Sequence, residues 1–415
     1  MSATRDGRGN ETRRLLQLLA HREGSDLEWP PAARWGWRTF AETCDIHQLA
    51  PFIYSRLQGL TTTAVPPELL EYLRTRFHEV CACNYQLAKK LVDLTSMLEN
   101  GGVPVLAFKG PSLAMAVYGG LSLRQCQDLD LVIHKEHLVR AVHLMTGWGF
   151  RAIPTPDWPQ ITPYRCRPEN SRDVARGQEI PFCAPDSSYY VDVHWQLGDI
   201  YWRSLSPDVE KLWERAERQD LPQGSVSTLC REDLFLALCA HGTRHRWLYL
   251  KWLLDIAELL RKAGTLDWSR IEEMARIRPG AGAAASVAVI LARDLLQAPL
   301  PAEAGKILPA TSRALAVAAG LREELLLRGQ TSGEKPATLL ALEARPVARM
   351  KYRAVRMIRY PDSLFREIFV RVDPKDRALI CLSPGLQFLY YIIRPLRLVL
   401  KHAMRMARTL WSTAG

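Results

Sequence analysis

Residues 103–133 read VPVLAFKGPSLAMAVYGGLSLRQCQDLDLVI, and residues 189–195 read YYVDVHW. The longer stretch predicts a strand, a glycine turn, a helix, a loop and a second strand. Because residues alternate between the two faces of a strand, Asp128 and Asp130 share one face, and Asp192 takes one face of the shorter stretch. If the two strands are neighbours, three carboxylates meet at one end of a sheet. Such acids repel each other unless a cation lies among them, and hard oxygen ligands suit Mg²⁺.

The turn between the first strand and its helix has the composition of a phosphate-binding loop. Gly110 allows the backbone to approach a phosphate closely, Lys109 supplies positive charge, and Ser112 offers a hydroxyl near the start of the helix. Arg124 lies four residues before the first of the acids, where it is placed to reach a phosphate oxygen. These parts together predict a metal and phosphate site.

Composition and charge narrow the class of partner. The chain has 415 residues, of which 47% are hydrophobic, so it can bury a large core and form two or three lobes. The net charge of +11 favours anionic partners such as nucleotides, nucleic acid, an acidic carrier or a membrane surface. The nine cysteines include no C-x-x-C pair, which is typical of buried thiols in a reducing compartment. The polar residues 1–14 lack the apolar region of a signal peptide, and no apolar run reaches about 18 residues, so we expect a cytoplasmic protein.

Apolar periodicity divides the chain into four regions. Residues 1–100 predict an N-terminal helical region, and residues 101–205 the α/β core. Residues 206–300 predict a helical domain that begins with SPDVEKLWERAERQ at 206–219, and residues 301–415 a basic helical region.

Four histidines admit a structural or a functional interpretation. His194 shares a strand face with Asp192, so it either contacts the acceptor or a phosphate, or orients that acid. His47 lies between helical apolar positions and predicts a structural histidine. His241 and His245 have a spacing that metals use, but a glycine follows the first where a metalloprotease has glutamate, so we expect no structural zinc. Elsewhere, a lone acid on an apolar helix face, Asp255, predicts a buried partner.

Two positively charged segments each allow two interpretations. Residues 154–188 are proline-rich and carry four arginines, which indicates a solvated basic loop or a lid over the acceptor. Residues 384–410 are apolar and basic together. They predict either a helix on an anionic membrane surface or a helix packed on the body of the protein with a solvated basic face.

Several segments resemble one family. They are FKGPSLAMAVYGGLSLRQCQDLDLVI (108–133), VDVHWQL (191–197), LCAHGTRHRWLYLKWLLDIAELL (238–260) and LARDLLQAPLP (291–301). They are similar to the large bacterial family usually called uncharacterised nucleotidyltransferase family proteins, within the polymerase-β-like nucleotidyltransferase superfamily. The resemblance runs from roughly Ala41 to Arg397.

The resemblance implies an α+β fold, with a small mixed-sheet nucleotidyltransferase core between N-terminal and C-terminal helical regions. It implies that Asp128 and Asp130 are metal ligands and that Asp192 is the third catalytic carboxylate. It assigns three residues to the triphosphate-binding turn, namely Lys109, Gly110 and Ser112. One departure from the superfamily is Pro111, which stands where a residue with an N–H is usual and has none to offer a phosphate.

The first functional hypothesis is a nucleotidyltransferase that depends on Mg²⁺ or Mn²⁺. It would move a nucleoside monophosphate from a nucleoside triphosphate such as ATP to a hydroxyl or phosphate of an acceptor, and release pyrophosphate. The acceptor could be a small molecule, a saccharide, a peptide or a protein. A second hypothesis keeps the fold and uses a nucleotide-sugar donor, and a third is a non-catalytic module that binds nucleotide or membrane.

Overall fold

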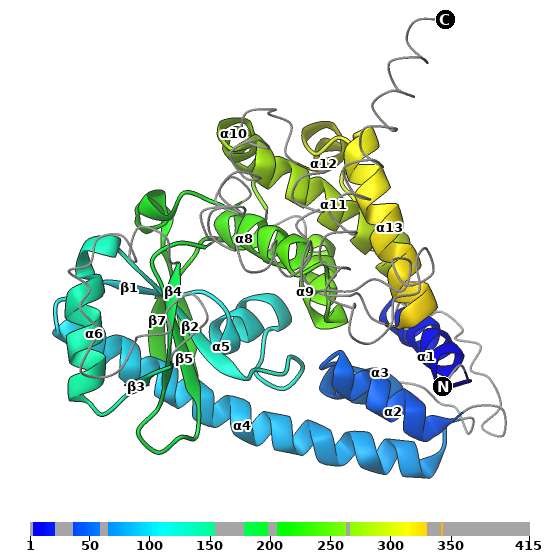
Figure 1. Ribbon diagram of the computed structural model, residues 1–415, viewed down its shortest axis with the longest axis horizontal. Coiled ribbons are helices and arrows are strands. Elements are labelled where there is room, and N and C mark those ends of the chain that lie inside the picture. The colour runs from blue at the N-terminus through cyan, green and yellow to red at the C-terminus, as the bar shows by residue number, and fades with distance from the viewer. Residues whose placement is uncertain are drawn as a thin grey trace, which may run out of the picture. The chain divides into compact units, whose positions relative to one another are not determined.

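The computed structural model describes residues 3–20, 36–58, 65–153, 178–197, 206–262, 266–329 and 342. Contacts divide the chain into residues 1–344 and 345–415, and every described residue belongs to the first unit. This unit combines a mixed β-sheet with helices that precede and follow it, so the predicted α+β class is confirmed (Figure 1). The segment 384–410 and most of the segment 154–188 fall outside the described residues, so the predictions for them do too.

The described strands form one sheet in the order β3-β4-β5-β2-β1-β7-β6. Their bounds are β1 Val105–Ala107, β2 Asp128–Ile133, β3 Arg151–Ala152, β4 Glu179–Cys183, β5 Tyr190–His194, β6 Glu217–Leu221 and β7 Gly224–Thr228. Strand β2 is parallel to β5 and antiparallel to β1, which in turn is parallel to β7. The two strands predicted within residues 103–133 and the one at 189–195 are therefore present.

Alternation in the central strands gives the sheet an apolar face. Leu129 and Leu131 of β2 and Val193 of β5 are buried in one cluster with α4 (Pro67–Asn100) and α6 (Leu138–Gly147). Burying side chains of this size contributes roughly 1.5–3 kcal/mol each. A register slip of one residue would exchange these side chains with the acids, so the packing fixes the acids on the opposite face.

The opposite face of the sheet is turned toward α8 (Arg231–Arg244) and α9 (Leu250–Arg261). Leu106, Phe108 and Val132 belong to a second core, which includes residues of both helices. The acids of β2 lie on the same face as Val132 because residues two apart point the same way. The predicted site therefore lies between the sheet and α8–α9.

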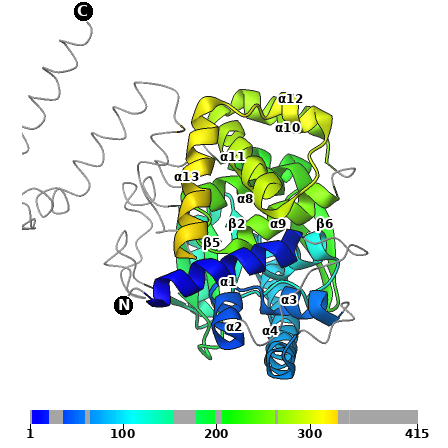
Figure 2. The same ribbon diagram turned by 90° about the vertical axis from the view of Figure 1, so that its right-hand side faces the viewer.

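The remaining helices come from the two ends of the described chain. Their bounds are α1 Ala3–Ala20, α2 Trp37–Ile46, α3 Ala50–Gln58, α10 Trp268–Ile277, α11 Pro279–Leu296, α12 Ala302–Ile307 and α13 Ser312–Arg328. Helix α1 packs on α13, as Figure 2 shows. Among the described helices, α11 alone is long and apolar enough to cross a membrane, and 67% of it is buried inside the fold, as expected of a core helix.

The predicted helix over residues 206–219 is wrong. This segment forms two short 3₁₀ turns, Val209–Lys211 and Trp213–Arg215, and then enters β6. Strand β6 lies at the edge of the sheet and is largely exposed, so it lacks the apolar alternation that marks a strand. The sheet thus continues past residue 205 as far as Thr228.

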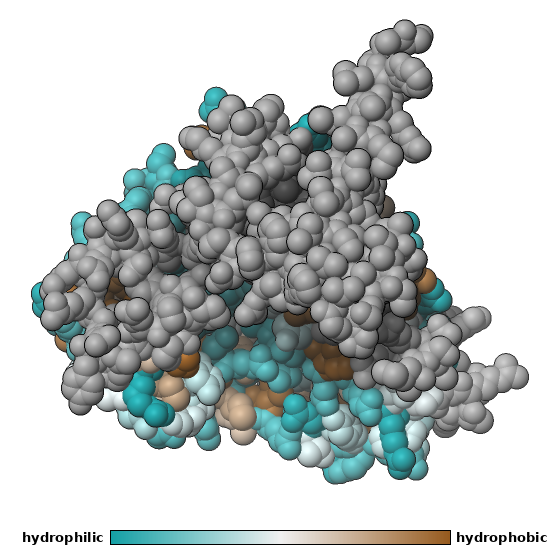
Figure 3. Space-filling model, viewed as in Figure 1, coloured by the Kyte–Doolittle hydropathy of each residue, from teal (hydrophilic) through white to brown (hydrophobic). Residues whose placement is uncertain are grey.

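The prediction of an irregular segment at 154–188 is wrong at its end, where β4 pairs with both β3 and β5. The proline at position 181 lies inside this strand, and its type argues against a strand in a single sequence. Figure 3 shows hydrophilic side chains mixed with smaller hydrophobic areas along the lower part of the view, where α4 runs. Exposed charged pairs such as Lys89–Asp93 lie on the surface of α4.

Candidate active site

The acids of β2 and β5 meet because the two strands are parallel and in register. Asp130 is paired with Asp192, and an oxygen of each lies within 4.8 Å of the other and of a ring nitrogen of His194. Asp128 lies two residues before Asp130 on the same face, and all three acids line a cavity of about 280 Å³. The structure thus brings the three predicted acids together at one cavity.

Two cations hold Asp130. The Lys109 ammonium donates a hydrogen bond to Asp130 Oδ1 over 2.9 Å. His194 Nε2 lies 3.1 Å from the same oxygen, and its Nδ1 lies 3.0 Å from Glu179 Oε2. Burial opposes a charge on His194, but these two carboxylates outweigh it and raise its pKa to about 10. His194 therefore positions Asp130 and not Asp192, which corrects the predicted structural role.

The electrostatics of the acids favour an added cation. Burial and the neighbouring Asp130 raise the pKa of Asp192 to about 7, and they raise the pKa of Asp128 as well. Burial also opposes the charge of Asp130, but Lys109 and His194 outweigh it and lower that pKa. The ionised forms of Asp128 and Asp192 are thus disfavoured unless a cation lies beside them. Their oxygens are the donors that Mg²⁺ or Mn²⁺ prefers, so the residues present fit a divalent metal ion.

The glycine turn lies directly beside the acids. Gly110 begins the short helix α5 (Gly110–Leu113) with a φ of +59°, and a Cβ at this position would lie 3.0 Å from the carbonyl oxygen of Asp128. Only glycine fits both conditions without strain. A π-helical turn, Ala114–Tyr118, continues this helix. The backbone of the predicted turn therefore touches the strand that carries the acids.

Ser112 does not face the cavity, which corrects its predicted place in the phosphate-binding turn. Its side chain is buried, and its Oγ donates to Thr228 Oγ1 over 3.0 Å. The threonine hydroxyl in turn donates to the carbonyl oxygen of Ala107. The physical reason is that β7 packs beside β1 and takes the serine hydroxyl into the interior of the sheet.

Arg124 borders the cavity, and its guanidinium forms hydrogen bonds with a buried carboxylate. Its Nε and one NH₂ group donate to the two carboxylate oxygens of Asp255 over 2.9 and 3.0 Å. The Tyr118 hydroxyl donates to the same carboxylate over 2.8 Å. The Arg124 guanidinium is therefore held in a buried ion pair at the cavity wall, because a carboxylate without exposure needs a partner. The partner that the sequence required for Asp255 is thereby found. The contact of Arg124 with a phosphate stays a prediction.

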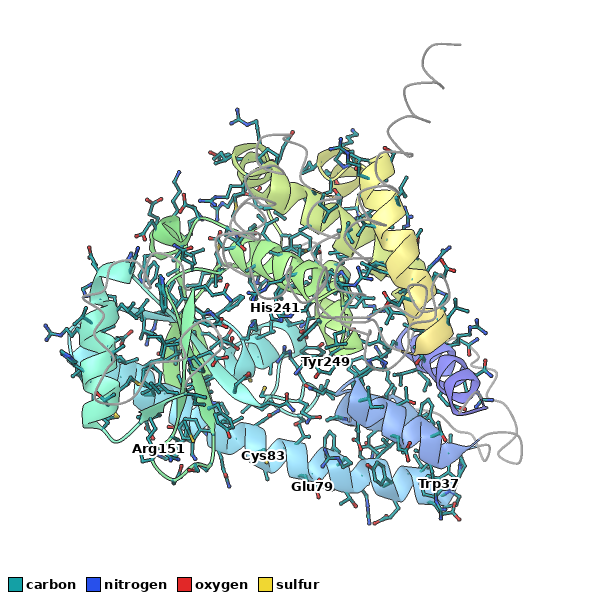
Figure 4. The ribbon with its side chains drawn as sticks, viewed as in Figure 1. Trp37, Glu79, Cys83, Arg151, His241 and Tyr249 are labelled. Carbon is teal, nitrogen blue, oxygen red and sulfur yellow. The ribbon has the colours of Figure 1, made fainter. Side chains whose placement is uncertain are left out.

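Helices α8 and α9, with the turn that joins them, supply an aromatic wall to the cavity, made of His241, His245, Tyr249 and Trp252. The Trp252 ring lies 4.7 Å from the His241 ring and 4.9 Å from the Tyr249 ring, centroid to centroid. Burial and nearby Arg244 lower the pKa of His245 to about 3, so this ring is neutral. Figure 4 shows His241 and Tyr249 on the side of these helices that faces α5. Neutral rings of this kind are surfaces on which bases or aromatic acceptors stack.

Three contributions to the cavity were not predicted from the sequence. The sequence signal for the aromatic wall is the four-residue spacing of His241 and His245, which places both rings on one side of the chain. Glu179 had no signal, because its strand follows a proline-rich segment. Lys251 lies four residues before Asp255, which places both on one face of α9, and that spacing could have indicated a shared buried surface.

Comparison with known proteins identifies the family. The family described as uncharacterised nucleotidyltransferase matches residues 34–297, which include the sheet, the acids and the α8–α9 wall. The comparisons with curated proteins and with solved structures gave no match. The matched part covers more than half of the chain and includes the segments 108–133, 191–197 and 238–260 that carry the resemblance. The chain belongs to the uncharacterised nucleotidyltransferase family, and is on that ground a transferase.

Proposed function

We propose that the protein transfers a nucleoside monophosphate from a nucleoside triphosphate to a hydroxyl or phosphate of an acceptor, with Mg²⁺ or Mn²⁺ as the metal. The observation that carries this proposal is the pairing of Asp130 with Asp192 across parallel strands, beside a glycine turn and inside one cavity. The family supplies the reaction class. The donor set supplies the reason for a divalent metal.

Asp128, Asp130 and Asp192 are the residues that would hold the metal. A divalent cation bound there would neutralise negative charge on the transferring phosphoryl group and the leaving pyrophosphate. Lys109 and His194 keep Asp130 ionised and fixed in direction, since both donate to the same oxygen. The acids are thus preorganised before substrate enters.

The proposed transfer makes one bond to phosphorus, breaks another, and needs one group to accept a proton. The acceptor hydroxyl oxygen forms a bond to the α-phosphorus while the bond from that phosphorus to the pyrophosphate oxygen breaks. The hydroxyl proton moves to a carboxylate, and Asp192 is the acid that we assign to this role because it lies on the neighbouring strand, opposite Asp130. A phosphate acceptor attacks in the same way and releases no proton.

The test is calorimetric titration of ATP, GTP, CTP and UTP, each with Mg²⁺, into the wild type and Asp130→Asn. Asparagine keeps the size of the side chain and removes its charge. We expect one or more nucleotides to bind the wild type and to lose more than about 100-fold in affinity in the variant, because a direct ligand should matter more than an outer one. The matched control is Asp93→Asn, an exposed acid on α4.

Equal binding to the wild type and Asp130→Asn would overturn the assignment of the acids. A nucleotide-sugar that binds more tightly than the corresponding triphosphate would contradict the proposed donor and favour sugar transfer. Once a donor binds, pyrophosphate release in the presence of candidate acceptors measures the transfer itself. Asp192→Asn should abolish this release from hydroxyl acceptors.

A further inference from the structure

Two pairs of neighbouring residues connect the N-terminal helices to α9 at the edge of the cavity. His47 Nδ1 accepts a hydrogen bond from the backbone N–H of Leu250 over 3.3 Å. The next residue along each segment continues the contact, since the Lys251 ammonium donates to Gln48 Oε1. The segment between α2 and α3 is thus fixed against the start of α9, and it places Gln48 in the cavity wall.

Gln48 is held in a conformation that glutamine rarely adopts. Its φ is +58°, in the left-handed region, and its backbone N–H donates to the carbonyl oxygen of Asp45. Its side-chain amide also donates to Gln127 Oε1 over 3.1 Å, just before β2. Strained residues of this kind persist where the surrounding structure requires them, and they gather at functional sites.

Lys251 is a buried cation whose partners are neutral. Only 8% of the residue is exposed, and it lines the same cavity as the acids. Its ammonium donates to Gln48 and to the carbonyl oxygen of Gln125 over 3.3 Å, and it forms no ion pair with a carboxylate in the described part of the chain. Two other cations of this cavity differ, since Lys109 is paired with Asp130 and Arg124 with Asp255.

A buried ammonium that forms no direct ion pair is costly, so its retention needs a reason. An ammonium has three N–H donors, and the described partners of Lys251 account for two of them. An anion that entered the cavity would supply both a direct ion pair and the third acceptor. Lysine binds phosphate in this way, as a compact point charge.

We propose that Lys251, positioned by Gln48, is a subsite for a phosphoryl group of a substrate. The Lys251 subsite rests on the proposed function in one respect, namely that the ligand of this cavity is phosphorylated. The group belongs either to the phosphate chain of the donor or to a phosphorylated acceptor. Both sources share the chemistry that the subsite recognises, and the test separates them.

The experiment is calorimetric titration of the full chain with inorganic triphosphate and with inorganic phosphate. Lys251→Met removes the charge and keeps the length of the side chain, whereas Lys251→Arg keeps the charge. The control is Lys89→Met, which removes an exposed lysine of α4. We expect Lys251→Met to weaken binding by about 10- to 100-fold, Lys251→Arg to weaken it less, and the control to leave it unchanged.

Loss of triphosphate binding in Lys251→Met supports a subsite for the donor chain. Loss of phosphate binding with unchanged triphosphate binding supports a subsite for the acceptor. Equal affinities in Lys251→Met and the wild type, or no binding of either probe to the wild type, would overturn the subsite. Lower thermal stability in Lys251→Met together with unchanged affinities would identify a purely structural lysine.

A second variant separates positioning from binding. Gln48→Gly relieves the left-handed strain, which favours stability, but removes the amide that pairs with Lys251 and Gln127, which opposes it. We therefore use probe binding as the readout, and we expect the variant to weaken the binding of the probe that Lys251→Met loses. Unchanged probe binding in this variant would remove Gln48 from the proposal. If Lys251→Met loses probe binding but Asp130→Asn leaves nucleotide binding intact, the subsite stands and the nucleotidyl-transfer proposal does not.

Discussion

At the scale of single residues, Gly110 meets two requirements at once: a left-handed backbone conformation and no room for a Cβ atom. Its backbone lies in the left-handed region, and a Cβ there would press on the carbonyl oxygen of the first acid at the start of β2. A turn glycine elsewhere in the chain, Gly119, has a similar φ of +73°, but a Cβ added to it would meet no described atom within 4 Å. Both glycines would strain the backbone if replaced, but only at Gly110 would a Cβ also collide with a neighbouring atom.

We expect Gly110→Ala to lower both the free energy of unfolding and the affinity for Mg-nucleotide. Gly119→Ala should lose about 1 kcal/mol of stability and keep nucleotide affinity, because it carries only the conformational cost. Denaturant unfolding and calorimetry on both variants measure the two effects. Full nucleotide affinity in Gly110→Ala would show that the close contact with Asp128 does not shape the site.

Single residues also mark what the sequence could and could not predict. The convergence of Asp128, Asp130 and Asp192 followed from alternation, because a period of two is a property of every strand. The partner of Arg124 did not follow, because it lies 131 residues away on α9. Ser112 was placed wrongly for a related reason, since the strand that takes its hydroxyl was not predicted.

At the scale of elements, the buried ion pair connects the loop before β2 to α9. Arg124 and Asp255 are 4% and 0% exposed, and Tyr118 at the end of the π-helical turn completes the contact. Because Lys251 is one helical turn before Asp255, the same connection sets the position of α9 against the acids. The register of α9 and the geometry of the site are thus linked.

Asp255→Asn should destabilise the protein by about 3–5 kcal/mol, because it leaves the guanidinium buried without a counter-ion. The double variant Arg124→Met/Asp255→Asn should recover much of this loss, because the guanidinium that Asp255→Asn leaves unpaired is removed with its partner. Denaturant unfolding of the wild type, the single variant and the double variant measures the difference. A double variant less stable than the single one would contradict an electrostatic origin.

The correctly predicted elements have a regular pattern of apolar residues or are bounded by glycine. Helix α4 ends at Asn100, where a glycine pair follows, and β2 carries its acids and leucines at alternating positions. Strand β6 was read as helix because its side chains are polar and charged, as suits an exposed edge. Strand β4 contains a proline, so its pairing with β3 and β5 identifies it and its sequence does not.

At the scale of the whole described unit, His47 links parts that are distant in sequence. Its Nε2 donates to the carbonyl oxygen of Gly329 over 2.8 Å, and its Nδ1 accepts from Leu250. This pattern requires the neutral imidazole, and burial lowers the pKa of His47 to about 4. The expected structural role of this histidine is confirmed.

Stability should therefore fall in acid. In the unfolded chain this histidine titrates near 6.5, so between pH 6.5 and pH 4 the unfolded state binds more protons than the folded state. The contribution, up to about 3 kcal/mol, is present above pH 6.5 and is lost as the pH falls toward 4. His47→Gln should reduce the difference in unfolding free energy between pH 7 and pH 5. The same difference in both proteins would assign the acid sensitivity to other groups.

The hydrogen bond from His47 to Gly329 spans 282 residues, and this has a consequence for synthesis. A ribosome adds about 5–20 residues per second, so the acceptor emerges roughly 15–60 seconds after the donor. Over that time α1, α2 and α3 have left the ribosome, but the surface of α13 on which α1 rests does not yet exist. We expect the nascent N-terminal helices to recruit chaperones, and a chain truncated before residue 312 to stay bound to them.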